Sequence, residues 1–380
     1  MPNSHPVARL TRAVIHTDRL AHNMRLLQDI VGARSLWPCI KANAYGHADE
    51  IIARELLRLG YDTFGVADVC EAVALIEEGI EATFIVLSNT LPEHAEALVA
   101  HGCEPIVCTP DTVRALARAA DKLGRRVAVH VNVDTGMGRI GIAPAEVGAF
   151  LDYCKSYPSI EIRGIMSHFA RADEADKRDA LGQLARFEEV IEIARSHEIG
   201  LRHMANSAAI FDIPGSHFDA ARPGISIYGL APSADIANPR VRDLQPILEW
   251  RTRITFLKEA PRGKGLSYGH DFHTERPSLI ATIPIGYGDG FSRRLSNDVD
   301  VLIGGMRCRQ VGRVTMDMSL VDVTPLRGRV SLGDEVVVIG RQGEETITAD
   351  ELAAKLGTIN YEIVTRIAER VPRVAISDDD

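Results

Sequence analysis

Lys41 stands between an apolar run and a turn, where an amine could carry out chemistry. Residues 36–40 predict a short strand, and the turn after Lys41 ends at Gly46, just before a helical pattern begins near His47. Lys41 is therefore expected at the C-terminal end of a strand, which is the catalytic face of a β/α barrel. An amine beside apolar walls can lose its proton readily enough to form an imine with an aldehyde. A lysine at a strand end can equally be a surface residue.

Residues 126–134 predict a strand whose two faces differ. Valines occupy alternate positions, and Ala128, His130, Asn132 and Asp134 lie between them, so the two sets point to opposite sides. In a barrel the valines would pack beneath the helices, and the polar set would point into the lumen. A half-buried strand with a solvated polar face would show the same alternation.

The elements that must position these residues alternate regularly up to about residue 230. Residues 63–67 predict a strand, and residues 68–78 predict a helix that stops at Gly79. The order repeats with a strand over 84–87 and a helix over 109–123. Strands that alternate with helices pair in parallel, and the count is close to that of a (β/α)8 barrel. We predict this barrel, although a doubly wound sheet would have the same periodicity.

The pattern changes at residues 231–247, where prolines and polar residues indicate a linker. Short β-rich runs follow, the longest of them over 311–323. We therefore predict two domains, an α/β barrel over residues 1–240 and a mostly β domain over residues 241–380.

The composition is typical of a soluble globular protein. The chain has 380 residues, of which 46% are hydrophobic and 25% charged, with a formal net charge of −9. This acidic balance argues against broad binding to nucleic acid or to a membrane. The 6 cysteines form no C-x-x-C pair, which argues against a zinc site or a disulfide framework and fits a cytoplasmic protein. We find neither a signal peptide nor a stretch that could span a bilayer.

Short sequence blocks stand in a specific order along nearly the whole chain. One block is the lysine motif around Lys41, and another places Tyr268 between a serine and a glycine. The blocks are 39–47, 133–139, 167–169, 205–209, 222–225, 267–269, 284–290, 312–317 and 358–362. No single block is specific, whereas the ordered set resembles the alanine racemase family. The resemblance implies an enzyme that uses pyridoxal 5′-phosphate (PLP) to interconvert L-alanine and D-alanine.

The resemblance also implies how PLP is held. Lys41 would bond to it covalently, and Arg222 would hydrogen-bond its pyridine nitrogen. Because an arginine cannot give up its proton there, the ring nitrogen would stay largely unprotonated, which limits side reactions such as transamination. Ser207 suits a helix N-terminus that faces the phosphate, and Gly224 allows a close backbone approach. The residues expected to bind the cofactor are Lys41, Tyr45, His168, Asn206, Ser207, Arg222, Gly224, Ile225 and Tyr361.

Racemisation removes a proton from one face of Cα and returns a proton on the other, so two bases are expected. The resemblance implies that these are Lys41 and Tyr268, the latter from the other subunit of an obligate homodimer. A tyrosine is a poor base unless its phenolate is stabilised. His168 would tune Tyr268 by contacting it and Arg222. The other residues expected to reach across the dimer, at the substrate entrance, are Tyr287, Met316 and Asp317.

Arg139 is expected to bind the substrate carboxylate, and here the chain departs from the commonest family pattern. Many relatives carry a lysine at the position of Asn132, modified to a carbamate whose negative charge holds the arginine. Asn132 offers only amide hydrogen bonds. Relatives with asparagine at this position, including broad-spectrum racemases, can use chloride instead. We therefore predict an anion near Asn132 and Arg139, and no metal.

The departure at Asn132 leaves a broad-spectrum racemase, or one for serine or basic amino acids, as an alternative to an alanine racemase. A barrel-type PLP decarboxylase would need a Gly-Gly-Gly phosphate loop and a catalytic cysteine motif, neither of which occurs. A D-threonine aldolase would need metal ligands near the C-terminus, and no histidine follows His273. A non-catalytic PLP-binding protein would usually lack the β domain that carries Tyr268.

Overall fold

A computed structural model describes residues 9–377 of the chain. It contains two compact units. The barrel unit comprises Arg19–Ala44 and Ala48–Gln245, and the β unit comprises Tyr45–His47, Pro246 onward and the described residues up to Asp18. The first strand of the chain, β1 (Arg12–His16), belongs to the β unit.

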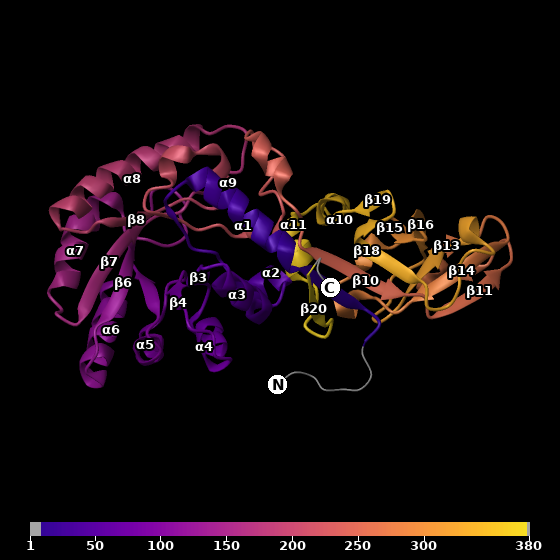
Figure 1. Cartoon of the computed structure of the whole chain (residues 1–380), viewed down its shortest axis with the longest axis horizontal. Helices are drawn as coiled ribbons and strands as arrows, with labels where there is room; N and C mark the ends of the chain where they lie inside the picture. The colour runs from indigo at the N-terminus through magenta and orange to yellow at the C-terminus, as the bar shows by residue number, and fades with distance from the viewer. Residues whose placement is uncertain (1–8, 378–380) are drawn as a thin grey trace. The chain divides into compact units, whose positions relative to one another are not determined.

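Parallel strands form the centre of the barrel unit (Figure 1). Their order is β2-β9-β8-β7-β6-β5-β4-β3, and a bridge between Cys39 and Gly65 joins the two ends of this 8-stranded sheet. The doubly wound alternative is excluded, and the predicted barrel is confirmed. The strands are β2 (Ser35–Leu36), β3 (Thr63–Val66), β4 (Thr83–Val86), β5 (Glu104–Val107), β6 (Val127–Asn132), β7 (Ile160–Met166), β8 (Leu201–His203) and β9 (Ala220–Ala221).

Helices lie around the outside of these strands (Figure 1). Their ends follow local signals: Asp68 accepts a hydrogen bond from the Cys70 N–H at the start of α4, and Gly124 ends α6 with a φ of 62°. The helices predicted over 68–78 and 109–123 are therefore confirmed. The helices are α1 (Thr17–Val31), α3 (Asp49–Arg58), α4 (Val69–Glu77), α5 (Ala95–Ala100), α6 (Pro110–Leu123), α7 (Val147–Lys155), α8 (Arg178–Ser196) and α9 (Ser207–Asp212).

The β unit is built on one large sheet of order β11-β14-β17-β16-β15-β18-β10-β1-β20, with β19 paired to β18. Strand β1 (Arg12–His16) pairs antiparallel with β10 and parallel with β20, so the first and last strands of the described residues lie side by side in this sheet. The remaining strands are β10 (Leu248–Arg253), β11 (Phe256–Ala260), β14 (Ser278–Ile283), β15 (Asp300–Ile303), β16 (Met306–Val311), β17 (Ser319–Asp322), β18 (Glu335–Gln342), β19 (Glu345–Ile347) and β20 (Arg373–Ile376).

The other elements of the β unit are short. A hairpin of β12 (Gly265–Leu266) and β13 (Phe272–His273) carries Tyr268 in the turn between its strands. Helices α10 (Ala349–Leu356) and α11 (Asn360–Thr365) follow β19 in the chain. The β-rich run predicted over 311–323 is wrong as one strand, because Gly312, with a φ of 75°, begins a turn that separates β16 from β17.

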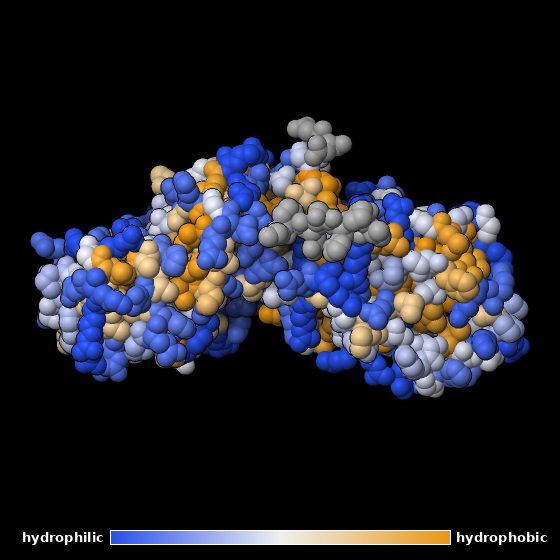
Figure 2. All heavy atoms as spheres, turned by 90° about the horizontal axis from the view of Figure 1, so that it is seen from below, coloured by the Kyte–Doolittle hydropathy of each residue, from blue (hydrophilic) through white to orange (hydrophobic). Residues whose placement is uncertain are grey.

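On the face of the molecule drawn in Figure 2, hydrophobic residues lie among hydrophilic ones. None of the helices within residues 9–377 combines the length and apolar character that crossing a membrane requires.

Candidate active site

Lys41 begins a helical turn of unusual hand. The turn, α2 (Lys41–Gly46), follows the bridge at Cys39, and Ala42, Asn43, Ala44 and Tyr45 have φ angles of 53°, 53°, 50° and 53°. Left-handed backbone costs roughly 1–2 kcal/mol per residue for amino acids other than glycine. A strained run of this kind persists only where its surroundings fix it, and such runs cluster at functional sites. The sequence predicted a turn here but not its hand.

Three cations converge on His168 in the barrel unit. Its pKa lies well below the ordinary value, because burial disfavours the charged form and the positive charges of Arg222, Arg139 and Lys41 add to this effect. Burial, with Arg139 nearby, also lowers the pKa of Arg222 to about 10. The structure therefore brings together four of the residues that the sequence predicted, and their combined positive charge suits an anionic ligand.

A chain of buried hydrogen bonds leads away from Arg222. Its Nη1 lies 2.5 Å from Nδ1 of His203, Nε2 of His203 lies 3.0 Å from Nδ1 of His130, and Nε2 of His130 lies 3.0 Å from Glu104. Arg163 pairs with the other oxygen of Glu104. Because an arginine only donates, each imidazole must accept at Nδ1 and donate at Nε2. Both histidines are therefore neutral, and the Glu104 carboxylate lies at the far end from the Arg222 cation.

These bonds confirm the predicted lumen-facing side of strand β6. His130 and His203 are fully buried, and Trp37 presents its edge to both rings at centroid distances of 5.9 and 4.9 Å. Sequence reasoning missed Glu104, because a carboxylate in an apolar strand has no spacing signal that pairs it with a histidine 26 residues later. A charged residue among the mainly apolar residues 103–108 was the available clue.

The neutral histidines predict a dependence of stability on pH. Burial lowers the pKa values of His130, His168 and His203 in the folded protein, so between those values and about 6.5 the unfolded chain binds more protons. The free energy of unfolding should therefore fall as pH decreases from 7 to 5, by up to about 1.4 kcal/mol per pH unit for each histidine. Urea unfolding at several pH values measures this slope, and a flat profile over this window would contradict it.

Ser207 and Asn206 lie at the N-terminus of α9, as predicted. The Asn206 side chain caps the helix by accepting from the Ala209 N–H at 3.0 Å. The Ser207 hydroxyl oxygen accepts from the N–H groups of Gly224 and Ser226 at 2.9 and 3.3 Å. The Gly224 N–H is thus already donated to Ser207. Both acceptor positions of this buried hydroxyl are occupied, so its own proton must go to a further acceptor, and none is found among residues 9–377.

Arg222 is positioned to donate further hydrogen bonds. Its Nη2 donates to the carbonyl oxygen of Ser167 at 2.7 Å and lies 3.5 Å from Nδ1 of His168, which is the contact that the sequence predicted. Within the described part of the chain, its Nε–H has no hydrogen-bond partner. The guanidinium therefore keeps a donor for a ligand while the protein holds its other end.

Asn132 and Arg139 line one small pocket together with His168. The Asn132 amide nitrogen donates to the carbonyl oxygen of Ile140 at 3.1 Å, which fixes the side chain, and the same nitrogen carries a second N–H donor. The pocket contains the neighbours that the predicted anion requires, a guanidinium and an amide.

The remaining predicted residues lie in the β unit. Tyr268 and Met316 are 71% and 53% exposed, and Tyr287 is exposed as well. The rings of Tyr45 and Tyr361 lie 6.1 Å apart, so the two tyrosines predicted to bind phosphate are neighbours. The exposed side chains of Tyr268, Tyr287 and Met316 are accessible to another molecule.

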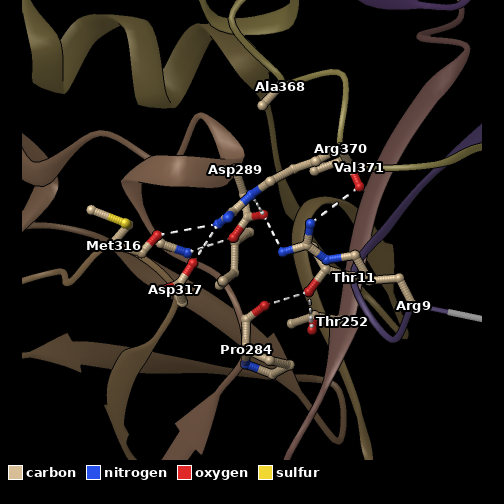
Figure 3. A network of polar contacts seen from close by, with 12 residues as sticks. Arg9, Thr11, Thr252, Pro284, Asp289, Met316, Asp317, Ala368, Arg370 and Val371 are labelled. Atoms are coloured by element: carbon tan, nitrogen blue, oxygen red, sulfur yellow. Dashed lines mark hydrogen bonds and ion pairs between the residues drawn. The ribbon is translucent and has the colours of Figure 1, made fainter.

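Asp289 ties together the turns that carry Tyr287 and Asp317. This fully buried carboxylate accepts from the Gly286 N–H at 2.9 Å and from Arg370 at 2.9 Å, and Arg9 also donates to it. Figure 3 shows both guanidinium groups directed at Asp289. Arg370 also donates to the Asp317 carboxylate at 2.8 Å, a contact that the sequence did not predict. The glycine-rich block 284–290 was the signal that could have drawn attention to Asp289.

Comparison with known proteins covers nearly the whole chain. Residues 15–232 match the alanine racemase N-terminal domain family, and residues 247–375 match the alanine racemase C-terminal domain family. An alanine racemase of Halothermothrix orenii is 42% identical over 370 residues, with 97% of each chain covered. One of Symbiobacterium thermophilum is 43% identical over 367 residues, with 96% of this chain and 97% of the relative covered.

Solved structures agree with these relatives. The alanine racemase of Clostridium difficile 630 has a TM-score of 0.93 at 32% identity, covering 98% of this chain and 97% of its own. The alanine racemase of Bacillus anthracis, solved with bound L-Ala-P, has a TM-score of 0.92 at 35% identity. The match covers 99% of this chain and 97% of the Bacillus anthracis chain. The chain therefore belongs to the alanine racemase family, whose members are PLP-dependent isomerases.

Proposed function

We propose that this protein interconverts L-alanine and D-alanine with PLP as cofactor. The observation that carries the proposal is the convergence of Lys41, Arg139, Arg222 and His168 at one end of the barrel, in a chain that belongs to the alanine racemase family over both of its parts. This is the end of a β/α barrel where catalysis occurs.

The residues present fit PLP. The Ser207 hydroxyl needs an acceptor, which a phosphate oxygen supplies, and the Arg222 Nε–H needs one, which the pyridine nitrogen supplies. Lys41 provides the amine that holds the aldehyde carbon. When bound, PLP supplies the electron sink that acidifies the Cα–H bond of the substrate.

The side chains of this protein then bind the substrate and move its proton. Arg139 binds the substrate carboxylate, because a guanidinium matches two carboxylate oxygens at once. Lys41 exchanges a proton with one face of Cα. Arg222 keeps its own proton, because a guanidinium is not deprotonated in a protein and the neutral His203 only accepts a hydrogen bond from it. This fixed charge keeps the cofactor ring in one protonation state during the reaction.

Tyr268 serves the other face of Cα, and we propose that it does so in the active site of a second copy of the chain. Its 71% exposure, together with the exposure of Tyr287 and Met316, supports a face that a partner covers. The active form is then an obligate homodimer with two composite sites.

Hybrid dimers test whether Tyr268 acts across the interface. A Lys41→Ala subunit paired with a Tyr268→Phe subunit has one site with both bases intact and one with neither. Random mixing of two nearly inactive variants should therefore restore about a quarter of wild-type activity, because half of the dimers are hybrids with one working site. Co-expression with two affinity tags isolates the hybrids. If Tyr268 acts within its own chain, mixing restores nothing.

The substrate is identified by incubating the purified protein, loaded with PLP, with one amino acid at a time: L-alanine, L-serine, L-lysine or L-arginine. The products are then separated by chiral chromatography. D-alanine should dominate. The presence of asparagine at position 132 favours the second candidate, a broad-spectrum racemase. Yields of D-serine or D-lysine comparable to that of D-alanine would establish this second function instead.

We further propose that an anion such as chloride binds between Asn132 and Arg139. It would supply the negative charge that orients the guanidinium, which the amide cannot supply. The small pocket lined by both residues supports this.

Bromide locates this anion directly, because it scatters anomalously. A crystal soaked in bromide should show an anomalous peak beside Asn132 and Arg139, and the KM for alanine should fall as chloride is added. The Asn132→Asp variant carries its own charge, so its KM should not respond to chloride. A pocket holding only water would contradict the proposal.

A further inference from the structure

The backbone immediately after Lys41 needs contacts from outside the turn to keep its conformation. Ala42, Asn43 and Ala44 all have left-handed φ angles between 50° and 53°. Of these residue types only asparagine tolerates that conformation readily. The Ala44 N–H donates to the Ile40 oxygen at 2.8 Å, at the start of this helical turn. Hydrogen bonds of the turn do not remove the steric cost of positive φ at residues other than glycine, so contacts from outside the turn must help to maintain it.

Glu71 supplies such a contact. One oxygen of its carboxylate accepts from the Ala42 N–H at 2.7 Å, and the other accepts from the Ala67 N–H at 2.7 Å. Ala67 directly follows strand β3, and Glu71 lies in the first turn of α4. The carboxylate therefore bridges the residue after Lys41 and the C-terminal end of the neighbouring strand with two short, charge-assisted hydrogen bonds.

A second contact holds the other side of the turn. The Asn43 side-chain oxygen accepts from the Asp49 N–H, the first residue of α3, at 2.9 Å. This bond links the turn to the element that follows it in sequence. Glu71 differs because it links the turn to the barrel wall, at the strand that also receives the closing bridge from Cys39.

We propose that Glu71 is a positioning residue for Lys41. By locking the left-handed turn to the end of β3, it fixes where the Lys41 backbone lies and so where its amine points. Without the carboxylate the Ala42 N–H loses its partner, the turn relaxes, and the amine moves from the position it must occupy beside the cofactor. This role rests on the proposed function of Lys41.

Glu71→Gln tests the proposal, with Glu77→Gln as its control. Glutamine has the shape of glutamate, but its NH2 group would face one of the two N–H donors, so one bond must be lost. Glu77 is an exposed residue of the same helix, and its replacement by glutamine removes the same charge. We expect kcat of Glu71→Gln to fall about 10- to 100-fold, since displacement of about 1 Å can cost this much. The KM for alanine should change little, because Arg139 is untouched.

Hydrogen–deuterium exchange of residues 41–46, measured on holoenzyme by mass spectrometry, reports on the turn itself. Exchange should be faster in Glu71→Gln than in wild type and unchanged in Glu77→Gln. Faster exchange with unchanged kcat would show that Glu71 does not position Lys41 for catalysis. Unchanged exchange would show that Glu71 does not hold the turn. If the wild-type protein proved not to racemise amino acids, the proposed function would fail, while the exchange result would still decide whether Glu71 holds the turn.

Discussion

Replacing Lys41 with alanine should lower kcat for alanine racemisation about 10⁴-fold while the barrel stays folded. Two functions are lost at once, the covalent hold on the cofactor and the proton exchange at one face of Cα, and a positioned base alone contributes about 10²–10⁴-fold. Lys41 is only partly buried, so no core packing is lost. Initial rates at saturating PLP, in both directions, measure the loss, and circular dichroism checks the fold.

Two further variants separate charge from chemistry. Lys41→Arg keeps the positive charge but cannot bond to the aldehyde, so its activity should be as low as that of Lys41→Ala. Lys122→Ala removes an exposed lysine of α6 whose ion pair with Glu96 lies at the surface, and it should be as active as wild type. A Lys41→Ala enzyme that retained more than about 1% of wild-type kcat would contradict the role of this amine.

Local signals predicted the barrel well because its helices are bounded by local chemistry. The cap at Asp68, the cap at Thr109 and the left-handed Gly124 are each formed by residues within a few positions of the helix end. The alternation along β6 likewise depends only on the pleat of one strand. Where a feature of the fold is determined within about one turn of chain, the sequence was sufficient to find it.

Features that depend on distant residues were not predictable in this way. Strand β1 belongs to the β unit because it pairs with β10 and β20, and no periodicity within 12–16 reveals partners more than 200 residues away. The run 311–323 has β propensity throughout and is nevertheless broken by the turn at Gly312. Propensity describes what a segment can form, whereas pairing decides what it does form.

The candidate site likewise contains residues that the sequence predicted and residues that it did not. Lys41, Arg222 and His168 were predicted through a resemblance that spans the whole chain, and the barrel unit brings them together. Glu104 and Glu71 were missed, because each acts through a hydrogen bond to a group 26 or 29 residues away in sequence. Residues that hold other residues leave no motif of their own, so they become visible only when the contacts are known.

Tyr268→Phe should lower kcat for racemisation by about 10²–10⁴-fold, because it removes one of two bases without removing the ring. Tyr268 is so exposed in the single chain that its hydroxyl adds nothing to the core. Its phenolate would need support from neighbours, and the substitution leaves those neighbours in place. The same rate assay as for the lysine variants measures this loss, and the substrate KM should change little because Arg139 still binds the carboxylate.

Isotope exchange distinguishes a second base from a residue that only shapes the site. In D2O, Lys41 of the Tyr268→Phe enzyme still reaches one face of Cα, so one enantiomer of alanine should exchange its Cα hydrogen for deuterium while keeping its configuration. The other enantiomer presents its hydrogen to the missing base and should exchange far more slowly. Two bases on opposite faces require this asymmetry. Equal slowing of exchange for both enantiomers would mean that Tyr268 positions the substrate and transfers no proton, and the second proton would then have to come from another group.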